Sequence, residues 1–135
     1  IHPFANVYIE STYSITEALG VVSGFDVNER KWRIWQVKDS GEIEALTAWG
    51  DRRLIDLSIN RQNNHLTLLF NDSNEGNANS GMIMHGHEIK NLSELTQLSF
   101  DQTTRPLSIS QWGEFIFMGR ADGQIWRGQL RSGSN

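Results

Sequence analysis

The sequence predicts an all-β domain, and two observations support this fold class. Apolar and polar residues alternate with a period of two through most of the chain, which places one face of each strand in a core and the other in water. Gly, Asn and Asp separate the alternating segments, and these residues tolerate the left-handed backbone that tight hairpin turns need. The spacing typical of helices is scarce.

Each alternating segment is expected to be a short strand. In chain order these are residues 6–13, 19–27, 31–38, 42–49, 54–60, 65–71, 82–89, 95–100, 107–111, 115–119 and 124–130. Turn residues occupy 28–30, 39–41, 61–64 and 122–123, and Pro stands only at Pro3 and Pro106, where a strand can begin. Asn91, with Glu94 three residues on, predicts one helical turn at 91–95. The polar segment 72–81 has no large side chain to anchor it and predicts an exposed loop.

Composition narrows the function classes. The 135 residues fit one domain, 1–135. The formal charge of −4 disfavours nonspecific electrostatic binding of nucleic acid. Cys is absent, so the chain has no disulfide, thiolate nucleophile or thiolate metal ligand. No run approaches the 18 apolar residues of a membrane span, and none is expected. The chain opens on Ile1 rather than Met, so we expect a processed protein or a piece of a longer one.

Internal similarity predicts about three repeats, at 19–53, 54–103 and 104–131. Leu107-Ser108-Ile109 matches Leu57-Ser58-Ile59 at an offset of 50, and the strands that follow match at the same offset. The first repeat matches the last at an offset of 82, with Phe25 aligned to Leu107 and Trp35 to Phe117. The shared order is strand, turn, strand, Asp-Gly-type turn, strand.

The segment from Leu107 through Trp126 resembles a blade of a WD-repeat-type β-propeller. In that family an inner strand is followed by a second strand ending near a small residue, here Gly119, then by an Asp-Gly turn, here Asp122-Gly123, and a strand carrying Trp. No Gly-His opens a blade and no Trp-Asp closes one, and the repeats are unevenly spaced. The resemblance implies propeller-like antiparallel sheets and a protein-binding role.

About three blades are too few to close a ring, because propellers typically have four to eight. The resemblance therefore implies an incomplete ring with unpaired edges, completed by further chain or by other copies of the chain. The strand at 6–13 is expected to complete the last blade after Leu130. A β-trefoil, which closes as a monomer near this length, and a β-sandwich remain as alternative folds.

Catalytic patterns are missing, and we expect no enzyme and no cofactor. His85-Gly86-His87 places two imidazoles on one face of a strand, as a metal site would need, but no further ligand follows at a known spacing. We therefore expect no metal at this pair, although the sequence leaves the question open. Glu42 and Glu44 share a strand face and are expected to be solvated.

Trp and Arg supply the candidate binding residues. Trp32 and Trp35 differ by an odd number, so they are expected on opposite faces of one strand, with Trp35 in the core. Trp49, Arg52 and Arg53 lie just before the second repeat, and Arg105 lies at the corresponding entry to the third. Trp and Arg are enriched at interface hot spots. The sequence thus favours a non-catalytic protein-binding or assembly module, within a larger protein or a homo-oligomer. A lectin-like domain that binds glycans through exposed Trp is the alternative.

Overall fold

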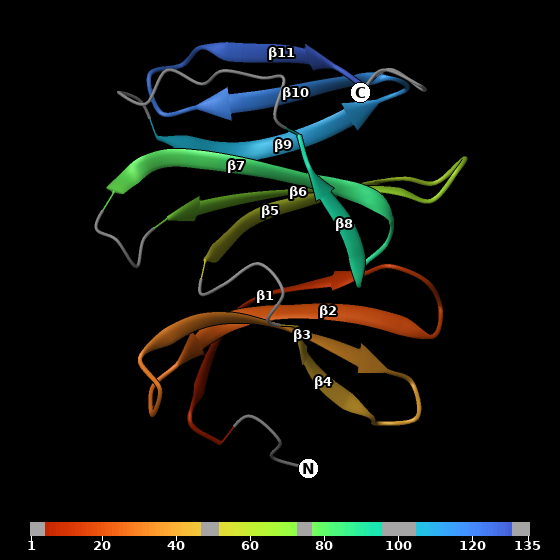
Figure 1. The fold of residues 1–135 in the computed structure, drawn as a ribbon, viewed down its shortest axis with the longest axis vertical. Helices are drawn as coiled ribbons and strands as arrows, with labels where there is room; N and C mark the ends of the chain where they lie inside the picture. Colours follow the sequence, from red (N-terminus) through yellow and green to blue (C-terminus); the bar gives the residue numbers. More distant parts are fainter. Residues whose placement is uncertain (1–4, 47–51, 73–76, 96–104, 131–135) are drawn as a thin grey trace.

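The computed structural model describes residues 5–46, 52–72, 77–95 and 105–130, and side chains at 72 and 77–80 are not described. Three antiparallel sheets, stacked along the long axis of the molecule, account for these residues (Figure 1). None of the described residues is helical, so this part of the chain holds no helix that could cross a membrane. The all-β prediction is confirmed.

The first and second sheets have four strands each, and the third has three. The first runs β1-β2-β3-β4, the second β5-β6-β7-β8 and the third β11-β10-β9, so each follows chain order. The strands are β1 Val7–Ser14, β2 Leu19–Asp26, β3 Lys31–Lys38, β4 Ile43–Leu46, β5 Arg53–Asn60, β6 His65–Asp72, β7 Asn77–Glu88, β8 Asn91–Glu94, β9 Pro106–Trp112, β10 Phe115–Arg120 and β11 Ile125–Gln129.

Three local expectations change. Residues 91–94 form β8 and not a helical turn, because they pair with β7, and tertiary pairing overrides a local capping signal. The polar loop expected at 72–81 is shorter, since β6 continues to Asp72 and β7 begins at Asn77. The expected strand at 95–100 lies outside the described residues except for Leu95.

The strand near the start of the chain does not complete the last sheet. Instead, β1 pairs with β2 in the first sheet, from Val7 opposite Asp26 to Ser14 opposite Gly20. The first sheet therefore begins at β1, whereas the repeat expected at 19–53 begins at β2. β1 pairs with β2, the next strand along the chain, because a hairpin between adjacent strands forms without bringing distant parts of the chain together.

The hairpin turns have the predicted backbone. Gly41 and Gly123 adopt φ of 91° and 84°, and Asn64 adopts φ of 59°, all in the left-handed region. Arg30, in the turn at 28–30, also has a positive φ, 55°. Asp26 supports this turn by accepting backbone bonds from Asn28 and Glu29.

The first strand of each sheet along the chain is called its inner strand here: β1, β5 and β9. These three strands run in the same direction, and side chains connect one to the next. Arg61 at the end of β5 donates to the carbonyls of Ser14 and Ile15 at the end of β1, at 2.9 and 2.7 Å. Asp56 and Ser58 of β5 accept the backbone N–H groups of Ile109 and Gln111 of β9, at 2.8 and 3.0 Å.

Each inner strand also carries one bulged residue at a comparable place. These residues are Glu10 in β1, Ile55 in β5 and Leu107 in β9, where the pairing with the next strand skips one position. A bulge twists the strand and redirects its side chain. The three sheets therefore share a local irregularity as well as a strand order.

Two hydrophobic clusters join the sheets, and both depend on the second sheet. Leu66, Leu68 and Phe70 of β6 face the first sheet, where they meet Val21 and Ile34 among others. Leu69 of β6 and Ile83 of β7 face the third sheet, where they meet Ile109, Ile116 and Met118. The middle sheet is therefore apolar on both faces, and no sheet in the described residues closes on itself.

Candidate functional site

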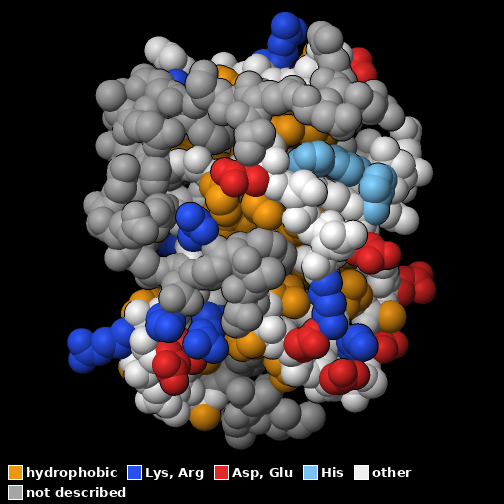
Figure 2. Space-filling view, in the orientation of Figure 1, with side chains coloured by type: hydrophobic (Ala, Val, Ile, Leu, Met, Phe, Trp, Pro, Cys, Tyr) orange, Lys and Arg blue, Asp and Glu red, His pale blue; other side chains and the backbone are white. Residues whose placement is uncertain are grey.

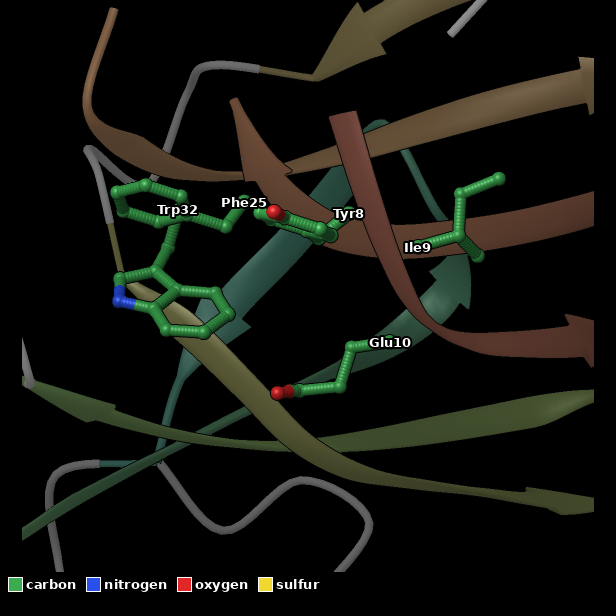
Figure 3. Close-up of a pocket in the computed structure, with 5 residues that line it drawn as sticks. All are labelled: Tyr8, Ile9, Glu10, Phe25 and Trp32. Carbon is green, nitrogen blue, oxygen red and sulfur yellow. The ribbon is translucent and has the colours of Figure 1, made fainter. Parts of the chain in front are cut away.

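A hollow of about 410 Å³ opens where β1 and β5 begin, on the face of the first sheet that turns toward β5. Tyr8, Ile9, Glu10, Phe25 and Trp32 line it. Tyr8 pairs with Phe25 and Phe25 with Trp32 across three strands, so register alone brings the aromatic side chains to one face. Figure 3 shows the three rings gathered at the hollow. We call this site the aromatic hollow.

The aromatic hollow combines exposed and half-buried apolar side chains. Tyr8 is 74% exposed and Ile9 50%, whereas Phe25 and Trp32 are half-buried. The Phe25 and Trp32 rings meet edge to face, with centroids 5.1 Å apart, which fixes their orientation. An apolar hollow with fixed aromatic walls can receive a side chain of another molecule without reorganising.

Arg53 connects the aromatic hollow to the second sheet. Its Nε donates to Oε1 of Glu10 at 2.9 Å, its terminal nitrogen donates to Oε2, and its guanidinium lies 4.5 Å from the Trp32 ring centroid. The hydrogen bond to Glu10 is the main reason that the pKa of Arg53 is raised. This two-point contact orients Glu10, the bulged residue of β1, and stacks a cation on Trp32.

The three predicted binding residues that the structure describes lie at the same end of the molecule but have different surroundings. Arg52 and Arg53 lead into β5 and Arg105 leads into β9, and the two strands lie side by side in one direction. Arg105 is exposed, and its carbonyl accepts the Ala121 N–H at 2.9 Å. The ion pair and cation–π contact of Arg53 are with the first sheet. Trp49 lies outside the described residues.

The sequence did not point to Tyr8, Glu10 or Phe25. Their one visible signal is the alternation that places Tyr8 and Phe25 on strands, which predicts a face but not its neighbours. The predicted division of Trp32 and Trp35 is confirmed, because Trp35 pairs with Val22 on the opposite face and is 8% exposed. Trp112 is 67% exposed, as the lectin-like alternative would need of a Trp that stacks on a glycan.

A histidine cluster lies at the joint between the second and third sheets. His65 of β6 approaches His85 and His87 of β7, with ring centroids 5.2 and 5.1 Å away, and Figure 2 shows histidine side chains together at the surface. His65 Nδ1 is 3.1 Å from Gln111 Oε1, and His65 Nε2 is 3.1 Å from His85 Nδ1. The described residues contain no group of three or more His, Cys, Asp and Glu placed to hold a metal ion.

The hydrogen-bond partners assign the tautomers of this cluster. Gln111 Oε1 only accepts, so His65 Nδ1 donates to it, and the Thr67 hydroxyl also donates, at 2.7 Å. His65 Nε2 is then an acceptor and receives the proton of His85 Nδ1. These hydrogen bonds link β7, β6 and β9, and they need a neutral His65, because a proton on its Nε2 would remove the acceptor for His85.

Acid is expected to loosen this joint. Burial lowers the pKa of His65, with a smaller contribution from His87, and burial followed by His65 and His87 lowers the pKa of His85. The folded chain therefore binds fewer protons than the unfolded chain as pH falls through about 6.5, the ordinary histidine value. This contribution to stability is fully present above that pH and is lost as pH falls toward the folded values.

Urea unfolding measured from pH 8 to pH 5 checks this prediction. The free energy of unfolding should fall as the pH is lowered, because unfolding is accompanied by the binding of at most about two protons, at His65 and His85. The variant His85→Gln should show a shallower fall over the same range. An equally steep fall in wild type and variant would contradict the assignment.

The described architecture defines the class of this protein as a propeller-like β-sheet domain with an incomplete ring. Among solved structures, the chain is similar to the β-propeller protein YCF48, solved bound to a D1 peptide. The TM-score is 0.67 at 18% identity, over 96% of this chain and 38% of that chain. The chain is also similar to the computationally designed Ika4 protein, with a TM-score of 0.50 at 10% identity over 92% of each chain.

These likenesses establish the fold and not the function. The chain spans 38% of the length of the YCF48 chain. No family model and no curated protein matches it. The propeller-like part of the sequence prediction is therefore confirmed, whereas the WD-repeat type stays a prediction.

Proposed function

We propose that this chain is a non-catalytic protein-binding module, and that the aromatic hollow receives an apolar side chain from a partner protein. The exposure of Tyr8 and Ile9 beside the half-buried Phe25 and Trp32 is the observation that carries the proposal. Aromatic anchors next to a partly desolvated pocket are typical of interface hot spots. The module needs no cofactor for this role.

The surroundings of the aromatic hollow favour a neutral, apolar anchor. Glu10 and Arg53 satisfy each other beside it, so neither carboxylate nor guanidinium is left to select a charged ligand there. Arg52 and Arg105 lead into β5 and β9 and do not line the hollow. YCF48, which has a similar fold, was solved with a peptide bound, and this supports a peptide as the partner of this chain.

Tyr8→Ala tests the aromatic hollow. Peptides are first selected from a displayed random library on the immobilised chain, and their affinities for wild type and variant are then compared. We expect a loss of about 2 kcal/mol, roughly 30-fold, because an interface anchor is truncated. Tyr8 is 74% exposed, so the fold should not suffer.

Ile125→Ala, which truncates a 73% exposed apolar side chain on the third sheet, is the matched control and should leave the affinity unchanged. Failure to select any peptide, or equal binding by Tyr8→Ala, would contradict the proposal. Binding on a glycan array with quenching of Trp fluorescence would favour the lectin-like alternative instead.

We propose further that the third sheet forms an interface with other copies of the chain. Its face away from the second sheet carries Trp112, Phe117 and Ile125, and Trp112 and Ile125 are 67% and 73% exposed. Such an apolar sheet face is typical of a surface that another sheet covers.

Sedimentation of the isolated chain tests assembly. We expect a mass above that of one chain at high concentration, and Ile125→Arg should restore the mass of one chain, since burying an unpaired charge opposes association. A wild-type chain that sediments as one copy at every concentration would show that copies of this chain do not complete the ring.

A further inference from the structure

A second cavity, of about 380 Å³, lies between the first and second sheets at the opposite end from the aromatic hollow. It is bounded by the β1–β2 hairpin, by β3, by the end of β5 and by the β7–β8 hairpin. The cavity is separate from the proposed peptide site, because the two share no lining residue. Its size falls within the range of small-molecule sites, roughly 300–1,000 Å³.

Polar contacts between the two sheets fix the shape of this cavity. On one side, Arg61 donates to the carbonyls of Ser14 and Ile15, which holds the β1–β2 hairpin against the end of β5. On another side, Lys90 forms an ion pair with Glu44, which joins the β7–β8 turn to β4. The walls are thus held by contacts between elements, and a ligand would meet a largely preformed site.

Most of the lining is apolar. Ile15 and Ile89 are buried, and Leu19 and Ile59 pack against the same core cluster, so these four side chains form a hydrophobic floor. Lys90 is neutralised by Glu44 at the rim, while Glu88 is exposed. This floor favours an uncharged ligand, because desolvating a charge against it would be costly.

Gln36 supplies the buried polar group of the cavity, because the other polar residues that line it are exposed: Thr16, Asn64, His87, Glu88 and Lys90. It is 6% exposed and lines the cavity, so its amide lies at the apolar floor rather than at the solvent rim. A ligand that hydrogen-bonds to this amide satisfies it inside the cavity, whereas a ligand without polar atoms would cover the amide and leave it without a partner. One amide presents an acceptor and a donor next to each other, and its complement is another donor and acceptor pair.

We propose that this cavity binds a small neutral molecule with an apolar body and an adjacent donor and acceptor, as in a carboxamide, lactam or imide. The apolar body contacts Ile15, Leu19, Ile59 and Ile89. The donor and acceptor pair with the Gln36 amide. Neither the aromatic hollow nor a protein partner is needed for this binding.

Benzamide is the probe, and toluene, which has the ring without the amide, is its comparison. In titrations followed by NMR, benzamide should shift the Gln36 side-chain amide and the methyl signals of the four floor residues, and bind about tenfold more tightly than toluene. Gln36→Leu should weaken benzamide about tenfold and leave toluene binding intact, which also shows that the variant is folded.

Three results would overturn the proposal: benzamide binding no tighter than toluene, equal benzamide affinity in wild type and Gln36→Leu, or shifts confined to residues outside the cavity. Intermolecular nuclear Overhauser contacts in the wild type give a second measurement that does not depend on the variant. Contacts from the benzamide ring to the methyl groups of Ile15 and Ile59 support the site, and their absence at saturation rejects it.

Discussion

Replacing Asp56 by alanine is expected to lower the free energy of unfolding by about 3 kcal/mol, because its carboxylate is bonded to two strands. Oδ2 accepts the Ile109 N–H of β9 at 2.8 Å, and Oδ1 accepts the Leu57 N–H at 2.9 Å. Tyr13 of β1 also contacts Asp56, and its pKa is raised, mainly by burial and further by the charges of Asp56 and Glu10. The substitution would thus affect contacts with both neighbouring sheets.

Urea unfolding at pH 7 measures this loss, and Asp56→Asn is the matched variant. Asparagine keeps one carbonyl acceptor at nearly the same place, so we expect it to retain roughly half of the lost stability. A value for Asp56→Ala within about 0.5 kcal/mol of the wild type, the range of an ordinary surface change, would show that the carboxylate does not hold the sheets together.

Gly24→Ala is expected to be similarly damaging, at about 2–3 kcal/mol, for a steric reason. An added Cβ would stand 2.3 Å from the Tyr8 carbonyl oxygen and 3.1 Å from its carbonyl carbon. Both are backbone atoms of the paired strand β1, so the strand itself must move. Because Tyr8 belongs to the aromatic hollow, peptide binding should weaken along with stability.

Gly20→Ala provides the control on the same strand. Its added Cβ would meet the Tyr13 carbonyl oxygen at 3.3 Å, which a movement of a few tenths of an ångström relieves. Thermal unfolding of both variants should show a large loss for Gly24→Ala and a small change for Gly20→Ala. Equal losses would mean that the close approach at Tyr8 is absorbed elsewhere.

Much of the fold was predictable because it depends on local rules. Alternation predicted strands at 31–38 and 65–71, and the structure places them at Lys31–Lys38 and His65–Asp72. Gly41 and Gly123 adopt the left-handed backbone that their turns required. Both signals act within a few residues, so one sequence contains them completely.

The register of the repeats was less predictable. The offset of 50 holds for β6 and β10, where Leu66 and Ile116 are both buried. It fails for β5 and β9, because Ile59 pairs with Leu66, whereas the residue opposite Ile116 is Gln111. The hairpin turn is longer in the second sheet than in the third. A shift of two keeps every side chain on its face, so alternation cannot detect it.

The alignment of the first repeat shows the same ambiguity at the level of whole strands. The offset of 82 matched β2 with β9, although β1 and β9 hold the same place in the order of their sheets. All these strands share one apolar–polar pattern, so a slip by one strand still aligns apolar residues with each other. Only pairing partners distinguish the alternatives.

The candidate sites depended on contacts that the sequence does not encode locally. Arg53 was a predicted binding residue, but its contacts with Glu10 and Trp32 arise from the stacking of β5 on the first sheet. The bulge at Glu10 turns that carboxylate toward Arg53, and a bulge leaves no mark in an alternating pattern. The approach of His65 to His85 likewise needed the β6–β7 pairing.

The two-sided middle sheet has a consequence for how the chain reaches its native state. During synthesis, the first eight strands emerge before β9 and β10, and Leu69 and Ile83 have no cover until those strands arrive. A fragment truncated after β8 would present that bare layer to solvent and would be prone to aggregation. Because the third sheet is synthesised last, the solubility of the first two sheets depends on its arrival to cover this apolar face.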